Sequence, residues 1–161
     1  MENYAVGGSI HVIVNNQIGF TTVPKKARSG TYASDLAKTI NAPIFHVNAD
    51  AYEDVIYVFK AAAQYRQKYN KDVIIDIIGY RKMGHNELDQ PSFTQPLMYK
   101  QVNKMVPVIK KYEDQLTQEG LLTQEKRAVM KKKINDIMNE AYIKSKSHKF
   151  TAEDWKTPEW E

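Results

Sequence analysis

The pattern of apolar and polar positions is clearest in the stretch Ser9–Phe20, which reads SIHVIVNNQIGF. Successive side chains of an extended chain point to opposite faces, and apolar residues occupy both faces here, which is typical of a parallel strand covered on both sides. The pattern therefore predicts a central strand. It ends in the side-chain amides of Asn15, Asn16 and Gln17. Open parallel sheets bind ligands at the carboxyl ends of their strands, so we expect a site there.

Two further apolar runs, 43–49 and 72–81, read as buried strands. Segments with helical spacing of apolar residues separate the three runs. The order strand, helix, strand, helix, strand predicts a parallel α/β fold with right-handed crossovers. Three strands are too few for a complete nucleotide-binding sheet. Segment 21–31 is polar and basic, and we expect it to be a loop that leaves the site.

Several residues mark the ends of predicted helices. Ser34 can cap a short helix, and Asp50–Glu53 resembles a capping box for a helix that ends near Tyr69. In the second half of the chain, Gly120 is placed to end one helix and Thr123 to cap the last one. One apolar stripe follows this last helix, with lysines opposite: Met130, Ile134, Ile137, Met138 and Ala141.

The loop at 82–92 has no apolar period and separates the strands from these helices. We therefore divide the chain into an α/β part, residues 1–92, and a helical extension, residues 93–161, that packs on it. Near the end of the chain, Trp155 and Trp160 would be exposed apolar surface unless they packed on a neighbour.

Composition narrows the function classes. The chain of 161 residues carries a formal charge of +4, and the segment from Lys100 to Lys149 holds 12 basic against 6 acidic residues. This excess of basic residues is typical of a solvated helix face. Aromatic residues are not interleaved with the basic ones in the way that single-strand nucleic-acid binders use, so nucleic-acid binding is not indicated. No stretch is long and apolar enough to span a bilayer. With no cysteine and no close spacing among the four histidines, a zinc site is not expected.

Three residues could carry chemistry at the strand ends. Asn16 offers an amide oxygen and Ile18 a backbone carbonyl, both suitable for Mg²⁺, although Asn16 is also an ordinary turn residue. His85 follows the third strand and could bind a phosphate or transfer a proton, or simply bond to the loop backbone. Beside it, Arg81 and the acidic residues Glu87 and Asp89 could form an acid-base pair with His85 or hold the loop.

The remaining histidines suggest no site. His11 and His46 fall within strands and are expected to be satisfied core residues, and His148 is expected to be solvated.

The segment Asn15–Phe20 resembles the closing half of the thiamine diphosphate and magnesium motif of the 2-oxoglutarate dehydrogenase family, in its thiamine-dependent decarboxylating component. The resemblance continues through APIFHVN at 42–48, the strand at 72–81, GHNELD at 84–89 and TQPLMY at 94–99. It implies that 1–92 is the C-terminal part of a Rossmann-like domain that binds thiamine diphosphate and Mg²⁺, in a chain that begins inside a longer one.

The resemblance also assigns roles to residues. Asn16 and Ile18 are expected to bind Mg²⁺, Gln17 to lie in the cofactor site, and His85 to contact the diphosphate and to be a tentative catalytic residue. The remaining metal ligands are expected from the diphosphate, water and an upstream acidic residue. The glutamate that activates the thiamine ring is expected from another domain.

The function implied is oxidative decarboxylation of 2-oxoglutarate in the tricarboxylic acid cycle, with transfer of the succinyl group to a lipoyl-bearing succinyltransferase component. A homodimer is expected, in the mitochondrial matrix of a eukaryote or the cytoplasm of a bacterium. The isolated chain is predicted to be inactive. Two alternatives stay open: the 2-oxoadipate enzyme of the same family, and a non-catalytic module whose basic helices after Lys100 bind an acidic partner.

Overall fold

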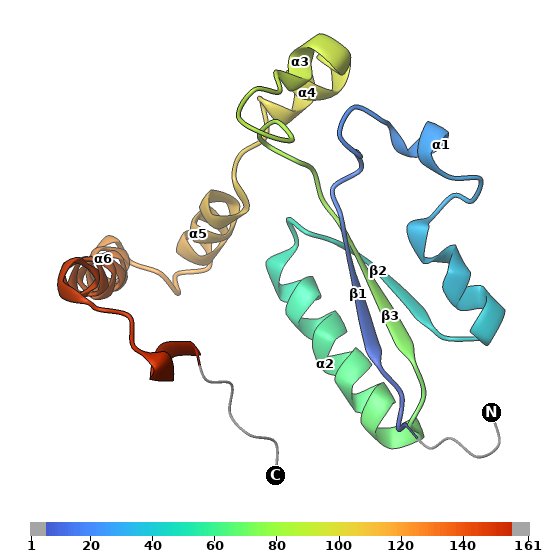
Figure 1. Ribbon diagram of the computed structural model, residues 1–161, viewed down its shortest axis with the longest axis horizontal. Helices are drawn as coiled ribbons and strands as arrows, with labels where there is room; N and C mark the ends of the chain where they lie inside the picture. Colours follow the sequence, from blue (N-terminus) through green and yellow to red (C-terminus); the bar gives the residue numbers. More distant parts are fainter. Residues whose placement is uncertain (1–5, 156–161) are drawn as a thin grey trace. The chain divides into compact units, whose positions relative to one another are not determined.

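The structure is a computed structural model, and it describes residues 6–155 (Figure 1). Trp160, which was considered above as a packing residue, lies outside this range. The chain forms two compact units that divide between Tyr112 and Glu113. The predicted boundary between a cofactor-binding part, residues 1–92, and a helical extension, residues 93–161, stays a prediction. The first helices after residue 92 belong to the first compact unit.

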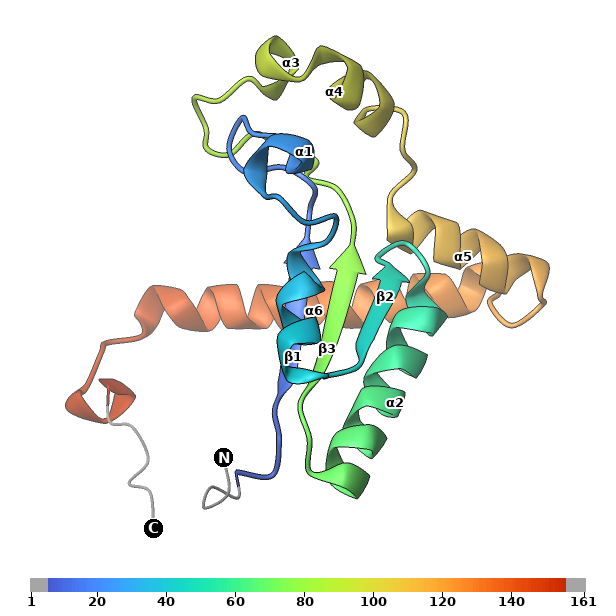
Figure 2. The same ribbon diagram turned by 90° about the vertical axis from the view of Figure 1, so that its right-hand side faces the viewer.

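The first unit contains a parallel three-stranded sheet of β1 (Ile10–Asn15), β2 (Ile44–Asn48) and β3 (Val73–Ile78). The strand order is β1-β3-β2, and β3 pairs along its length with both neighbours. The predicted parallel α/β fold is therefore confirmed (Figure 2).

The prediction that β1 is the central strand is wrong among the described residues. β3 pairs on both sides and so occupies the centre, with its first four residues buried, whereas β1 lies at the edge with Val12 45% and Val14 77% exposed. His11 is also exposed, so it is not a core histidine.

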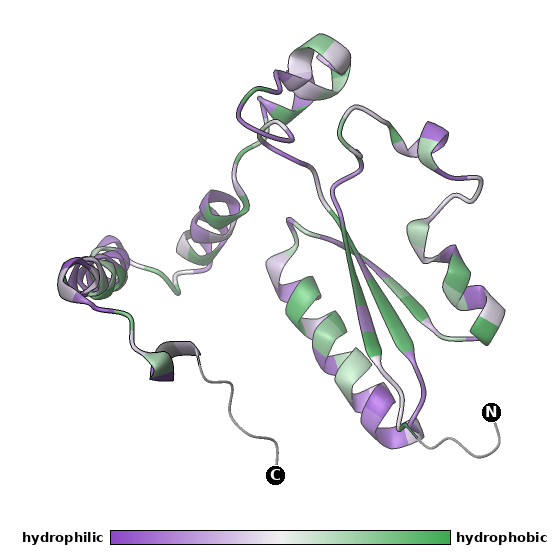
Figure 3. Ribbon diagram, viewed as in Figure 1, coloured by the Kyte–Doolittle hydropathy of each residue, from purple (hydrophilic) through white to green (hydrophobic). Residues whose placement is uncertain are grey.

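Two helical segments cover the two faces of the sheet (Figure 1). The helix α2 (Tyr52–Tyr69) packs its Ala62 against Val73 and Ile75 of β3, which forms the apolar core. In Figure 3 the ribbon is coloured by hydropathy, and much of the strands and parts of α2 are green. The 3₁₀ helix η1 (Ala33–Ile40) covers the opposite face. Because side chains alternate along β3, Ile75 faces α2 and Asp76 faces η1.

Two of the predicted caps are corrected by the structure. Ser34 does not cap η1; its side chain is buried and its hydroxyl donates to Asp76, while Asp35 accepts the backbone N–H of Tyr32. Asp50 forms no capping box either, because its carboxylate pairs with Lys111 and α2 begins without a side-chain cap.

Short helices follow the strand ends. The predicted loop at 21–31 contains α1 (Pro24–Ala27), and α3 (Pro91–Thr94) and α4 (Pro96–Val102) follow the loop after β3. Figure 2 shows α1, α3 and α4 beyond the carboxyl ends of the strands. The turns that carry the candidate residues therefore lie at that end of the sheet.

The end of the first unit and the second unit share the helix α5 (Val108–Gln118), which is followed by α6 (Gln124–Ser147) and η2 (Ala152–Trp155). Gly120 has φ +74 after α5, and the hydroxyl of Thr123 accepts the N–H of Lys126 at 3.3 Å, so both helix-end predictions are confirmed. The apolar stripe of α6 is exposed, and so is Trp155. None of the helices among residues 6–155 has both the length and the apolar character that a membrane span needs.

Candidate functional site

The turn after β1 is built by its own asparagines. The side-chain oxygen of Asn15 accepts the N–H of Gln17 at 3.1 Å, and that of Asn16 accepts the N–H of Ile18 at 3.2 Å. Gln17 adopts the left-handed conformation, with φ +62. These two bonds fix the reversal of the chain and hold Asn16 and Ile18 within one turn, because short polar side chains can satisfy nearby backbone donors.

Next to this turn lies a cavity of about 230 Å³, which we call the strand-end hollow. Its lining comes from the last residues of β1, the turn, α1 and the start of η1: Ile13, Val14, Asn15, Asn16, Gln17, Ile18, Gly19, Thr22, Pro24, Ala27, Arg28 and Ala33. The hollow thus lies where a parallel sheet is expected to bind its ligand.

The ends of β1 and β3 are joined through Gly79. Its N–H donates to the carbonyl of Asn15 at 2.9 Å, and its carbonyl accepts the side-chain amide of Gln17 at 2.7 Å. The amide nitrogen of Gln17 therefore ties the two strand ends together. Its position in the cofactor site stays a prediction.

Phe20 occupies a tight turn in which Gly19 and Thr22 exchange two backbone hydrogen bonds of 2.8 and 2.7 Å. Phe20 has φ +51, a conformation that is unusual for a bulky residue and costs free energy. The guanidinium of Arg81 donates to the carbonyl of Phe20 at 3.0 Å, so a residue that follows β3 holds this turn in place.

Arg81 is the centre of a network between the two loops. Besides Phe20, its guanidinium reaches the hydroxyl of Tyr99 at 3.1 Å and the carboxylate of Asp89 at 3.6 Å. The hydroxyl of buried Tyr99 in turn donates to the carbonyl of Met83 at 3.2 Å. From the sequence, Arg81 was expected either to pair with His85 or to hold the loop, but its contacts to Phe20 and Tyr99 depend on tertiary structure and were not predicted.

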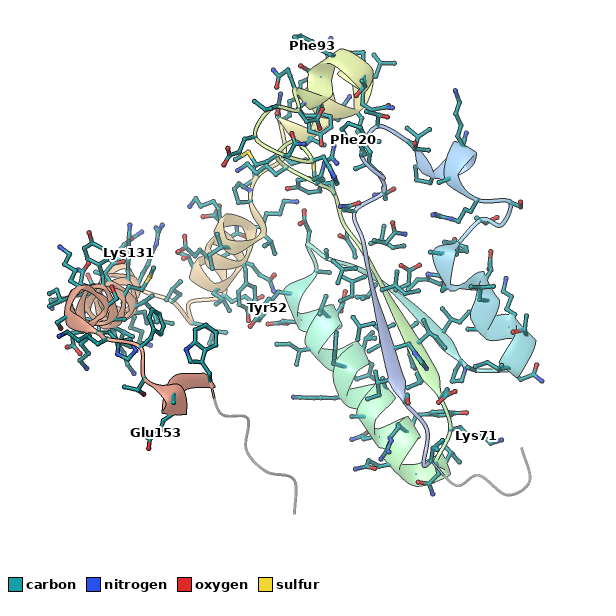
Figure 4. All side chains as sticks on the ribbon, in the orientation of Figure 1. Phe20, Tyr52, Lys71, Phe93, Lys131 and Glu153 are labelled. Carbon is teal, nitrogen blue, oxygen red and sulfur yellow. The ribbon has the colours of Figure 1, made fainter. Side chains whose placement is uncertain are left out.

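The start of α4 adds a second tie between the loops. The side-chain amide of Gln95 donates to the carbonyl of Thr21 at 2.9 Å. Figure 4 labels Phe20 on the loop after β1, close to the segment that carries α3 and α4.

His85 lies on the loop that this network holds. Its backbone N–H donates to the carboxylate of Asp89 at 2.8 Å, and its imidazole lies 5.0 Å from the ring of Phe20, tilted by 48°. Of the two alternatives for the loop, Arg81 and Asp89 follow the second: they hold it through hydrogen bonds. Glu87 is exposed to solvent.

The donor set at the turn suits a cation that arrives with its own anionic ligand. Asn16 and Ile18 offer neutral oxygens, and no group of three or more His, Asp or Glu side chains among the described residues could hold a metal ion. The oxygen of Asn16 that bonds to the N–H of Ile18 keeps a second lone pair for a metal. These residues fit Mg²⁺ bound to phosphate oxygens, since Mg²⁺ keeps few all-protein cages.

A buried polar cluster lies under η1. The carboxylate of Asp76 receives the hydroxyl of Ser34 at 3.4 Å and contacts the imidazole of His46 at 3.0 Å. The ring of Tyr32 lies 4.2 Å from that imidazole. His46 is therefore satisfied but half-exposed, which corrects the prediction of a core position. The one sequence signal for this cluster was a charged residue, Asp76, within an apolar strand.

Comparisons with known proteins agree on one family. The family described as "Dehydrogenase E1 component" matches residues 1–153. The chain is 50% identical over 161 residues to "2-oxoglutarate dehydrogenase, mitochondrial" of Dictyostelium discoideum, covering 100% of this chain and 16% of that protein. It is 54% identical over 149 residues to "2-oxoglutarate dehydrogenase-like, mitochondrial" of Rattus norvegicus, covering 92% and 15%.

The "2-oxoglutarate dehydrogenase, mitochondrial" of Saccharomyces cerevisiae is 50% identical over 161 residues, with 100% and 16% covered. The chain thus spans about 16% of the length of the relatives it matches. The family depends on thiamine diphosphate. Since the family match covers nearly the whole sequence, this chain belongs to the dehydrogenase E1 component family.

Proposed function

We propose that this chain is one segment of a 2-oxoglutarate dehydrogenase and forms part of its site for thiamine diphosphate and Mg²⁺. The observation that carries the proposal is the strand-end hollow, which Asn16 and Ile18 line, together with the Arg81 network that joins the adjacent turn to the His85 loop. Relatives named for 2-oxoglutarate support the substrate.

Each candidate residue has a separate task in this proposal. The side-chain oxygen of Asn16 and the carbonyl of Ile18 bind Mg²⁺, and Gln17 keeps the turn against β3. His85 presents its imidazole to the diphosphate, with its ring beside that of Phe20 and its backbone N–H held by the carboxylate of Asp89. Thiamine diphosphate, when bound, supplies the chemistry that cleaves the bond to the departing carboxylate.

The partners follow from the reaction. The substrate is 2-oxoglutarate, the acceptor of the succinyl group is a lipoyl-bearing component of the complex, and the full-length protein is a homodimer. Relatives named as mitochondrial support a location in the mitochondrial matrix. The segment alone lacks an acidic metal ligand at the turn, so we expect it to be inactive without the rest of the protein.

The test is release of carbon dioxide from 2-oxoglutarate by the full-length protein, with 2-oxoadipate as the competing substrate. We expect release that requires both thiamine diphosphate and Mg²⁺ and that is faster with 2-oxoglutarate. A faster release from 2-oxoadipate would make 2-oxoadipate the assigned substrate. Absence of any carbon dioxide release would refute the proposal. Turnover by the isolated 161-residue chain would refute the claim that it is inactive.

A further inference from the structure

The strand-end hollow contains a cationic side chain to which nothing above gives a role. Arg28 follows α1 and is the one charged residue among the described residues that line the hollow. Its Nε–H is buried and has no hydrogen-bond partner among the described residues. Nη2 donates to the carbonyl of Thr31 at 3.5 Å, which is a long bond. Arg28 thus brings a positive charge and an unused donor to the hollow.

Nothing nearby in the sequence neutralises this charge. No acidic residue occurs between positions 3 and 34, whereas Lys25, Lys26 and Arg28 do. The next acidic residue, Asp35, is already engaged: its carboxylate accepts the N–H of Tyr32 at 2.9 Å and pairs with Lys38 at 2.7 Å. The hydrogen bond from Lys38, and then that from the Tyr32 backbone, lower the pKa of Asp35.

A buried donor without a partner is costly, and it is costlier on a charged group. The other residues that line the hollow are neutral, and no described residue accepts a hydrogen bond from this Nε–H. An oxyanion can accept this bond, since a guanidinium binds carboxylate and phosphate oxygens through two parallel N–H bonds. A lysine would present only a point charge at the same place.

We propose that Arg28 binds an oxyanion of a phosphate or carboxylate group in the strand-end hollow. The source is either the diphosphate of the cofactor or a carboxylate of the substrate, and only this choice of source rests on the proposed function. In both cases Arg28, Asn16 and Ile18 line the same hollow, and in this proposal Arg28 binds the anion while the neutral oxygens of Asn16 and Ile18 bind the cation.

The experiment compares Arg28→Gln, Arg28→Lys and wild type in the full-length protein, with Lys25→Gln as the control. Lys25 is exposed on α1 and does not line the hollow. Lys25→Gln therefore removes one positive charge, as Arg28→Gln does, without changing the lining of the hollow. Three quantities are measured: binding of inorganic diphosphate to the cofactor-free protein, affinity for thiamine diphosphate with Mg²⁺, and KM for 2-oxoglutarate. Circular dichroism checks that each variant is folded.

If the diphosphate is the source, Arg28→Gln weakens binding of inorganic diphosphate and of the cofactor by about 10-fold or more, the size expected for a lost charge-assisted hydrogen bond. If the substrate is the source, cofactor affinity is unchanged and KM rises by about 10-fold or more. Lys25→Gln resembles wild type in both cases. If Arg28→Gln does not fold, Arg28→Lys supplies the test, with a smaller loss in the same quantity.

A variant with unchanged diphosphate binding, cofactor affinity and KM would overturn the role of Arg28. The proposed function fails in a different way, through a wild-type protein that neither binds thiamine diphosphate nor releases carbon dioxide. Binding of inorganic diphosphate that Arg28→Gln abolishes would still support the anion site in that event.

Discussion

The imidazole of His85 lies 5.0 Å from the phenyl ring of Phe20, although 65 positions separate the two residues and they follow different strands. Their contact joins the turn after β1 to the loop after β3. The same two loops are bonded by Arg81, so the approach of the rings is supported by the backbone of Phe20 as well as its side chain. The candidate site is thus a property of two loops held together.

Arg81→Gln is expected to loosen this junction. The side chain of Arg81 is 14% exposed and loses its bonds to Phe20, Tyr99 and Asp89, which we expect to cost about 1–3 kcal/mol of stability. The free energy of unfolding by denaturant and the affinity for thiamine diphosphate, both measured on the full-length protein, should decrease together. Exposed Lys82 provides the control, because Lys82→Gln removes an adjacent charge but no bond of this network. Equal effects of the two variants would contradict the assignment.

Gly84→Ala is expected to displace His85. An added Cβ would clash with the carbonyl oxygen of Asp89 and lie 3.1 Å from that of Asn86, both of them backbone atoms that cannot turn away. Gly120→Ala is the comparison, since Gly120 has φ +74 but no heavy atom within 4 Å of the added Cβ. We expect a loss of about 1 kcal/mol at Gly120 from backbone strain and a larger loss at Gly84. Unfolding measurements that rank the two variants in the opposite order would show that the loop is not tightly closed.

Asp76→Ala is expected to destabilise the sheet by about 3 kcal/mol, because it leaves Ser34 and His46 without their buried carboxylate. Asp76→Asn keeps an oxygen for the hydroxyl of Ser34 and should cost less. The free energy of unfolding measures both, with exposed Asp54→Ala as the reference for loss of a surface carboxylate. A change within about 0.5 kcal/mol for Asp76→Ala, the usual range for surface sites, would contradict the role of this cluster.

Lowering the pH should remove the contribution of the Asp35 carboxylate to folding stability. The bonds from Lys38 and the Tyr32 backbone place its folded pKa below the ordinary 3.8, so its contribution is present above that value and is lost as the pH falls through the folded pKa. Stability measured from pH 6 to pH 2 should therefore fall less steeply below about pH 4 in Asp35→Asn than in wild type. Parallel pH profiles would refute the interpretation.

The sequence predicted the elements better than their places in the sheet. The apolar runs located all three strands, and Thr123 and Gly120 located helix ends, because these signals are local. Strand order could not be predicted, because it depends on pairing between strands that are far apart in the sequence. In the same way, Asp50 has the spacing of a cap, but a lysine 61 positions away takes its carboxylate.

In the candidate site, too, local contacts could be predicted from the sequence and tertiary contacts could not. The amides of Asn15 and Asn16 form the expected turn because their partners lie two residues away. The bonds of Arg81 and the unpaired donor of Arg28 are visible only when the loops are brought together. A charged residue inside an apolar strand, as at Asp76, was the one available hint of the cluster under η1.

The most direct test of the account is the affinity of the cofactor-free, full-length protein for thiamine diphosphate, titrated with and without Mg²⁺, in wild type and Asn16→Ala. Gln64→Ala, at an exposed position on α2, serves as the control. We expect Mg²⁺ to strengthen binding in wild type and in the control, and Asn16→Ala to weaken the Mg²⁺-dependent binding by at least about 10-fold. An Asn16→Ala protein that binds the cofactor with wild-type affinity and the same dependence on Mg²⁺ would contradict it.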